Sequence, residues 1–494
     1  MLLTLTVTGP VAATHDGEAL PPGCRWVRGM DTPDDHDDDV YGCPKSVVGF
    51  VDSGINPYHE VFRDDGYWAY QHPSTYIPGY PADAVALPIT LPPIGEQADW
   101  AELVREDCEL WKTVQPGKLY WFPGTRIIGG ISFDPWVEPF SGCNDLPTTG
   151  AEILDYRGHG TMVASRGGST QYGACLATDC RIVSVQYSGT VHTASPPTST
   201  AEVVAAVRWA ADNSTWIDAQ SNSWGPLVPL WEPTGQAGLL TANPELVRAV
   251  EYASSRHAAF WASGNGAGFR VGVLGHPTLL VPHLGASAYI VGGHDSGYMN
   301  VWPGFSPHVV ADSCAAWGAV QTSTSQSGET VSGGTSGATP FAAGGAGKLL
   351  LEARRLLGDL DTGFEGSVVA SGPAGLVPSG PLADGTFTKD ELRAVLLKTA
   401  TARPGVQWED GPTCTDPNSA PTPVKWTDVA PEYPEFIQIG YGAVDRVAQA
   451  LSLRVLKGEV PLPDRATTDQ YFAVDDQLRR ALYPIWSGGG GADR

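Results

Sequence analysis

The chain has 494 residues and carries 54 Asp and Glu against 30 Lys and Arg, which gives a formal net charge of -24. This charge repels nucleic acid, and the sequence contains no basic run that could neutralise a line of phosphates. The longest apolar stretches are too short for a membrane span, so we expect a soluble body. A chain of this length can bury a large core, and one main domain with a long insertion accounts for it.

The N-terminal region allows two interpretations. Its opening, MLLTLTVTGPVAA, is apolar but lacks the basic lead of a secretory signal, so it fits the end of a signal peptide or an ordinary first strand. The acidic run Asp31 to Gly42 offers clustered carboxylates to a calcium ion, yet it lacks the spaced pattern of a calcium loop, and such runs are usually solvated. We treat residues 1–45 as a leader and acidic segment.

Apolar runs alternate with helical patterns after the leader. Predicted strands cover residues 46–55, 126–133, 181–187, 218–225 and 258–268, of which the last two run into a loop or turn. Predicted helices cover residues 157–168, 201–213, 244–256, 337–357 and 388–400. This alternation is typical of a mainly parallel sheet covered by helices on both faces. The main domain is expected over residues 46–457, and residues 458–494 form a C-terminal extension with a Gly-rich tail.

Three short segments combine chemically reactive side chains with glycines and small residues. Asp52 lies in GFVDSGI at the end of a predicted strand, His159 lies in GHGT in the first turn of a predicted helix, and Ser336 lies in GTSGATP. Small residues let the backbone and a substrate approach closely. The order Asp, His, Ser is that of the subtilisin triad, so the chain is predicted to be a serine protease.

Four further stretches, GGISF, SNSWG, ASGNG and IGYGAVD, occur in the order of segments from one family. With the three segments above, they make the chain resemble the subtilisin-like serine proteases from about Ser46 to about Leu456. The resemblance implies an α/β, three-layer fold with a mainly parallel central sheet. It also implies a serine endopeptidase that acts on polypeptides, most simply as a monomer, with no cofactor for catalysis. Structural calcium is compatible with it, but the sequence names no ligands.

The resemblance assigns a role to each reactive side chain. Ser336 would be the nucleophile, His159 the base that takes its proton, and Asp52 the acid that fixes the imidazole tautomer. Asn265 in ASGNG resembles the oxyanion-hole asparagine and would donate to the tetrahedral intermediate. Each has a structural alternative, because an Asp that ends a strand is often a cap and a Gly-Asn-Gly segment is often only a turn. The histidines at 72, 257, 276 and 294 have no comparable context and are expected to be solvated or core residues.

Two segments resemble the walls of the family's primary specificity pocket. One wall would be formed by Ser223, Trp224 and Gly225, and the other by Ala262, Ser263 and Gly264. The SNSWGP segment also resembles the proprotein-convertase branch, which binds basic residues with nearby acids. Only Glu232 follows closely in sequence, and Gly266 after the asparagine carries no charge. We therefore expect a preference for apolar or aromatic side chains at the cleavage position.

The sequence departs from the family pattern in a long insertion and in a short leader, and its cysteines carry a separate signal. Residues 58–125 replace a short connection and are too aromatic for a disordered linker, so they either restrict the substrate or brace the fold. The eight cysteines contain no CxxC pair, which favours disulfides and an extracellular, secreted protein over a zinc site. Cys175 and Cys180 flank a short loop and are expected to pair. The leader is short for the folding prodomain that many relatives carry.

Three alternatives to a general endopeptidase remain open at this point. A catalytically silent scaffold could bind peptides, although the intact triad residues argue against it. A highly selective processing protease would use the same chemistry on few substrates. A lipase or esterase of the α/β-hydrolase type is disfavoured, because Gly337 and Ala338 follow Ser336 and the G-x-S-x-G elbow is absent.

Overall fold

The computed structural model describes the greater part of the chain. These residues are 14–15, 18–19, 24–28, 40–93, 100–133, 153–155, 158–171, 173–177, 179–187, 200–224, 244–262, 288–294, 309–312, 317–322, 325–331, 335–401, 406–408, 423–425 and 443–464. The predicted signal-like opening and most of the acidic run lie outside them, as does the Gly-rich tail.

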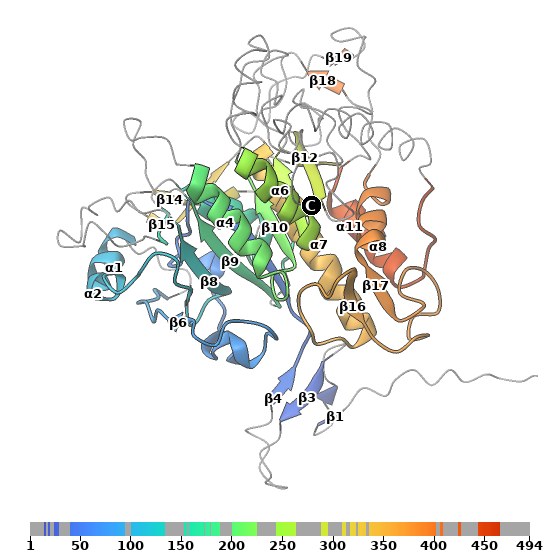
Figure 1. Ribbon diagram of the computed structural model, residues 1–494, viewed down its shortest axis with the longest axis horizontal. Coiled ribbons are helices and arrows are strands. Elements are labelled where there is room, and N and C mark those ends of the chain that lie inside the picture. The colour runs from blue at the N-terminus through green and yellow to red at the C-terminus, as the bar shows by residue number, and fades with distance from the viewer. Residues whose placement is uncertain are drawn as a thin grey trace, which may run out of the picture.

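One mixed sheet forms the centre of the described structure (Figure 1). Its strands are β5 (Ser46–Asp52), β6 (Val85–Ala86), β7 (Tyr120–Trp121), β8 (Ile127–Ser132), β9 (Cys180–Gln186), β10 (Ala219–Asn222), β11 (Ala258–Ala262), β12 (Ala288–His294) and β13 (Val309–Asp312). They lie in the order β13-β12-β11-β10-β5-β9-β8-β7-β6. The pairs from β13 to β8 are parallel, β7 is antiparallel to β8, and β6 is parallel to β7.

The helices and the smaller hairpins surround this sheet. The α-helices are α1 (Trp100–Glu106), α2 (Cys108–Trp111), α3 (His159–Gly168), α4 (Thr200–Asp212), α6 (Pro244–Arg256), α7 (Thr335–Leu357), α8 (Lys389–Lys398) and α11 (Arg446–Leu456). Short 3-10 helices are η1 (Glu60–Phe62), η2 (Tyr67–Tyr70) and η3 (Pro73–Thr75). The antiparallel hairpins are β1–β2 (Thr14–His15, Glu18–Ala19), β3–β4 (Arg25–Arg28, Val40–Gly42), β14–β15 (Trp317–Thr322, Ser325–Val331), β16–β17 (Val368–Ser371, Thr386–Thr388) and β18–β19 (Val406–Trp408, Pro423–Lys425).

Alternate side chains of β5 show how the layers form. Val48 and Phe50 pack into a core shared with α3 and α7, whereas Val47 and Val51 pack into a second core shared with α4 and α6. Because successive side chains of a strand point to opposite faces, an entirely buried strand such as β5 needs helices on both faces. The predicted three-layer α/β fold is confirmed, and every strand and helix range predicted from sequence overlaps an observed one.

The insertion at residues 58–125 packs against the sheet edge rather than standing apart from it. It supplies β6 and β7, and its aromatic side chains enter both cores, with Tyr58 and Phe122 on one face and Tyr80 and Trp121 on the other. The segment therefore braces the edge of the sheet beside β8. This is the bracing role that its aromatic composition allowed.

Candidate active site

Asp52 is the last residue of β5 and lies at the carboxyl edge of the parallel sheet. Its side chain is only 3% exposed, and its Oδ1 accepts a hydrogen bond of 2.8 Å from the backbone N–H of Ser53. The same oxygen lies 2.7 Å from Nδ1 of His159. Oδ2 is buried and has no hydrogen-bond partner among the described residues. The carboxylate is therefore held in one orientation, facing the imidazole.

His159 is the first residue of α3, and its side chain is 40% exposed. Two glycines bring it close to Asp52. Gly158 occupies the N-cap with φ of 74°, a left-handed conformation that suits glycine, and a Cβ at Gly160 would overlap the carbonyl oxygen of Gly54. The backbones of the GHGT and VDSG segments are in direct contact, which a side chain at Gly160 would prevent. The imidazole then has one face toward a buried acid and another toward solvent.

Ser336 lies in the first turn of α7, and its hydroxyl donates a 3.2 Å hydrogen bond to the carbonyl oxygen of Ser223. The hydroxyl of Ser223 in turn donates to the carbonyl of Ser336 at 3.0 Å. That carbonyl would normally accept from residue 340, but Pro340 has no N–H, so Ser223 takes its place. The proline of GTSGATP thus ties the first turn of α7 to the end of β10.

The helices that carry His159 and Ser336 are in direct contact. A Cβ at Gly344 of α7 would overlap the carbonyl of Gly167 in α3, and Arg166 Nε donates to the carbonyl of Gly337 at 3.3 Å. Close backbone contact of this kind requires residues without side chains. The small-residue pattern of α7 therefore fixes its first turn relative to α3.

Strands β10 and β11 bring the described residues of the two predicted wall segments to the carboxyl edge of the sheet. The two strands are parallel with Asn222 opposite Trp261, so Ser223 directly follows β10 beside Ala262, the last residue of β11. Asn222 Nδ2 also donates to the carbonyl of Phe260 at 3.1 Å. Trp224 packs between two aromatic rings, those of Tyr187 and Trp261, with centroid distances of 5.8 Å to each. Gly225, Ser263, Gly264 and the predicted oxyanion residue Asn265 lie outside the described residues.

Comparison with known sequences decides the family. The sequence pattern of the subtilase family matches residues 44–418, three quarters of the chain. This chain belongs to the subtilase family. It is accordingly a serine-type endopeptidase, and its substrates are polypeptides. The comparison with curated proteins returned no match.

Several solved structures are similar to this subtilase. The prenylagaramide maturation protease PagA is 17% identical, with 83% of this chain and 95% of that chain covered and a TM-score of 0.39. The patellamide maturation protease PatA is 15% identical, with 84% and 98% covered and a TM-score of 0.40. A cold adapted subtilisin-like serine proteinase is 19% identical, with 65% and 81% covered and a TM-score of 0.35. Because these superpositions are loose, the family assignment rests on the sequence match.

The sequence patterns did not identify one carboxylate beside the site of this subtilase. Asp155 is fully buried and accepts hydrogen bonds from the backbone N–H groups of Gly158 and Thr161, at 2.9 and 2.7 Å, and from the hydroxyl of Ser53 at 2.8 Å. Burial raises the pKa of this carboxyl, while its hydrogen bonds act in the opposite direction. The available signal was an acid shortly before GHGT in the segment DYRGHGT.

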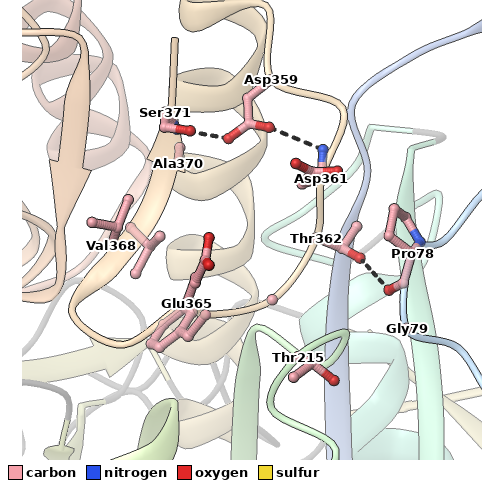
Figure 2. A pocket seen from close by; sticks show the side chains of 13 residues that line it. Pro78, Gly79, Thr215, Asp359, Asp361, Thr362, Glu365, Val368, Ala370 and Ser371 are labelled. Carbon is pink, nitrogen blue, oxygen red and sulfur yellow. Dashed lines mark hydrogen bonds between the residues drawn. The ribbon is translucent and has the colours of Figure 1, made fainter.

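A separate cavity of about 330 Å³ lies near the amino-terminal ends of the parallel strands, away from Asp52 (Figure 2). Its lining includes Thr215 and Gly363, and the N–H of Gly363 donates to Asp218, which also accepts from Val47 at the start of β5. Asp359 lines it too, but both of its oxygens accept backbone N–H groups, from Asp361 and Ser371. This cavity is therefore not part of the Asp52–His159 site.

The described residues contain neither a metal-ligand cluster nor a membrane-spanning helix. No group of three or more His, Cys, Asp or Glu side chains there could hold a metal ion. In the same part of the chain, no helix is both long and apolar enough to cross a bilayer.

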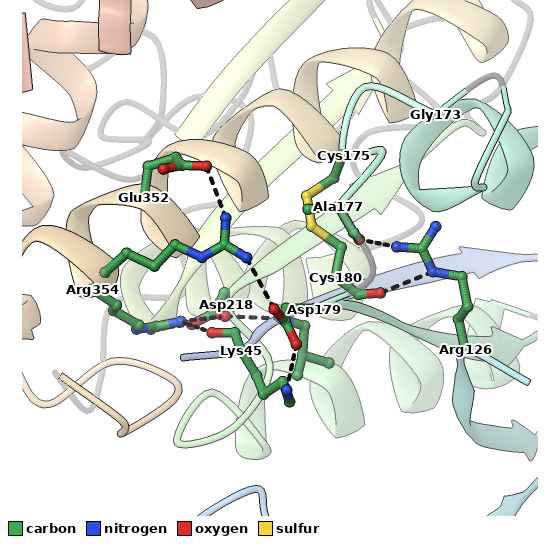
Figure 3. The surroundings of a disulfide bond; sticks show 12 residues. Lys45, Arg126, Gly173, Cys175, Ala177, Asp179, Cys180, Asp218, Glu352 and Arg354 are labelled. Carbon is green, nitrogen blue, oxygen red and sulfur yellow. Dashed lines mark hydrogen bonds and ion pairs between the residues drawn. A yellow bond between two sulfur atoms is a disulfide. The ribbon is translucent and has the colours of Figure 1, made fainter. Parts of the chain in front are cut away.

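The predicted disulfide Cys175–Cys180 is present and closes the loop that follows α3 (Figure 3). The N–H of Cys175 donates to the carbonyl of Gly167 at 3.1 Å, so the bridge joins the end of α3 to the start of β9. The buried guanidinium of Arg126 donates to the carbonyls of Cys180 and Ala177. A second disulfide joins Cys24 and Cys43, and Cys108 is also disulfide-bonded.

Proposed function

We propose that this subtilase cleaves peptide bonds through an acyl-enzyme formed on Ser336, with His159 as the general base and Asp52 as the group that orients the imidazole. The observation that carries the proposal is the 2.7 Å contact between His159 Nδ1 and the buried Asp52 carboxylate. That contact makes Nδ1 the hydrogen-bond donor, which leaves the lone pair of Nε2 to accept a proton. An imidazolium formed during the reaction is stabilised by the adjacent carboxylate.

Activation of Ser336 requires its hydroxyl to change partner. A serine hydroxyl has one proton to donate, and in the structure it is given to the carbonyl of Ser223. Rotation about the Cα–Cβ bond would redirect that proton to His159, whereupon the oxygen can attack a carbonyl carbon. Binding of an extended substrate along the end of β10 would compete for the Ser223 carbonyl and favour this rotation.

The developing oxyanion would be stabilised by donors from two segments. Ser336 lies in the first turn of α7, where unpaired N–H groups and the helix dipole favour negative charge. The side-chain amide of Asn265 is proposed as the second donor on the strength of its place in ASGNG. Nucleophile, base and oxyanion donors would then all come from the protein, so the proposed chemistry needs no cofactor.

We propose that the cleavage position accepts apolar or aromatic side chains. Support comes from the aromatic surroundings of Trp224 and from the lack of an acid on either wall segment. A panel of peptides that differ only at this position tests it, with faster cleavage after Phe or Leu than after Arg as the expected result. Faster cleavage after Arg would overturn the preference.

We further propose a secreted monomer, and structural calcium by family resemblance. The disulfides fit an oxidising compartment, where such bonds persist. Calcium would be detected as a fall in melting temperature when a chelator is added, and an unchanged temperature would exclude a stabilising ion. Sedimentation of the purified protein would establish the oligomeric state.

The decisive experiment compares purified wild-type protein with Ser336→Ala. A fluorophosphonate probe should label the wild type and not the variant, and only the wild type should digest unfolded casein. No labelling of a folded wild type would favour a latent enzyme or a peptide-binding scaffold. Labelling that survives the substitution would show that another residue is the nucleophile.

A further inference from the structure

We propose that Asp155 is a positioning residue that holds His159 against Asp52. The inference rests on the proposed function, because positioning matters only if His159 acts as the base. The carboxylate of Asp155 accepts hydrogen bonds from Gly158, Thr161 and Ser53, which lie close to His159 or Asp52 in the sequence. Its role would be to fix the start of α3 on the strand end that carries Asp52.

Asp155 accepts hydrogen bonds from residues on both sides of His159 in the sequence. One carboxylate oxygen accepts from Gly158 N–H at 2.9 Å and the other accepts from Thr161 N–H at 2.7 Å. Gly158 is the N-cap of α3 and has no side chain to cap the helix, so the carboxylate of Asp155 takes that function. An acid at a helix N-terminus is also favoured by the helix dipole.

Ser53 connects this cap to the catalytic strand. Its hydroxyl donates to Asp155 at 2.8 Å and accepts from the N–H of Gly160 at 2.9 Å. Its own N–H donates to Asp52 Oδ1, the oxygen that also faces His159. A continuous set of hydrogen bonds therefore runs from the first turn of α3 through Ser53 to the carboxylate that orients the imidazole.

The backbone around Asp155 is itself docked on the segment that follows Asp52. Ile55 and Leu154 form a parallel bridge, with Ile55 N–H donating to Ile153 and Asp155 N–H donating to Ile55. The backbone that carries the Asp155 carboxylate is therefore held in place. If it were removed, two backbone N–H groups and one hydroxyl of a buried site would lose their acceptor, and the first turn of α3 would shift to find others.

The test compares Asp155→Ala and Asp155→Asn with a matched control, Asp107→Asn. Asp107 is also a buried carboxylate held by three donors, the Thr90 N–H, the Thr90 hydroxyl and the Tyr58 hydroxyl, but it lies in the insertion. Asp155→Ala should lower kcat on a short peptide by about 10²-fold with KM changed less than about threefold, since a misplacement near 1 Å costs this much. Asp155→Asn keeps one acceptor oxygen and should recover part of that loss, while Asp107→Asn should leave kcat unchanged.

A second readout does not depend on catalysis. In protein labelled with ¹⁵N-histidine, the proton between His159 Nδ1 and Asp52 should give a downfield resonance that His159→Ala abolishes. Asp155→Ala should shift or abolish this resonance, and Asp107→Asn should retain it. An unchanged resonance together with an unchanged kcat in a folded Asp155→Ala would overturn the inference. An inactive and unlabelled wild type would instead contradict the proposed function, and the resonance would still decide the role of Asp155.

Discussion

Buried carboxylates lie at both the amino and the carboxyl edge of the central sheet, but their hydrogen-bond partners differ. At the amino edge, Asp218 accepts two hydrogen bonds from Arg354, of 2.6 and 2.8 Å, and two more from the N–H groups of Val47 and Gly363. At the carboxyl edge, Asp52 accepts from one backbone N–H and contacts one histidine, and its second oxygen has no partner among the described residues. A saturated ion pair stabilises structure, whereas an incompletely satisfied acid beside a half-exposed imidazole is typical of a functional site.

Two histidines show the same contrast. His257, just before β11, is fully buried, and its Nε2 lies 2.6 Å from the side-chain oxygen of Gln220, a neutral partner. Burial lowers its pKa to about 3, so it stays uncharged over the working range of most proteins. His159 faces a carboxylate and solvent instead. His257 is therefore a core residue, one of the two outcomes expected from its sequence context, and His159 is the histidine with both an acidic partner and access to solvent.

The largest effect that separates the two edges is expected from Asp52→Asn. The amide would disfavour the required imidazole tautomer, so kcat should fall by about 10⁴-fold, as for the equivalent change in a Ser-His-Asp triad. The melting temperature should change little, because Asp52 has no ion-pair partner other than His159 among the described residues. Steady-state kinetics with calorimetry would check this, and a kcat within tenfold of wild type would contradict it.

Asp218→Asn should produce the reverse result. Removing one member of a buried pair leaves the Arg354 charge uncompensated, which costs about 3–5 kcal/mol of unfolding free energy. The kcat per folded molecule should stay near that of wild type, because Asp218 lies at the other edge. Denaturant titration and peptide hydrolysis on the same preparation would test both parts. A stable variant with low kcat would mean that the two edges are coupled.

His257 should make stability fall on the acid side of neutrality. The unfolded chain binds a proton below the ordinary pKa of 6.5, whereas the folded chain does so only near 3, so the contribution is complete above pH 6.5 and is lost as the pH falls. The expected slope is up to ~1.4 kcal/mol per pH unit between those values. A His257→Gln variant, which can still donate to Gln220, should flatten unfolding curves measured from pH 7 to 4. If the unfolding free energies of the wild type and the variant changed equally with pH, His257 would be excluded as the cause.

Adjacent glycines of α7 offer the smallest and sharpest test. Gly344→Ala would press a methyl group into the Gly167 carbonyl and should cost about 1–3 kcal/mol of stability while displacing α3 from α7. At Gly345 the same methyl would meet only the side chains of Gln449 and Val444, at 3.4 and 3.6 Å. Gly345→Ala should therefore stabilise the helix by up to ~1 kcal/mol. Equal effects of the two substitutions would show that the helix contact does not constrain α7.

Much of the fold and the central pair of the site could be predicted because their signals are local. An apolar strand that ends on Asp52, and the glycines beside His159, each identify their residue within a few positions. The capping box of α8, with Thr388 and Glu391 bonded reciprocally, was likewise visible as a Thr before a helical pattern. The short hairpins were not predicted, because two-stranded pairing depends on packing more than on residue preference.

The sequence by itself determined the family, the parallel α/β layering and the candidate residues Asp52, His159 and Ser336, since these depend on patterns along the chain. Only the tertiary structure decided which buried acids are neutralised by ion pairs and which face an imidazole. It also revealed Asp155 and the exchange of hydrogen bonds between Ser223 and Ser336. The reason is physical. The contacts of Asp155 with Ser53 and of Ser223 with Ser336 join residues more than 100 positions apart, so no pattern along the chain specifies the partner that folding brings to them.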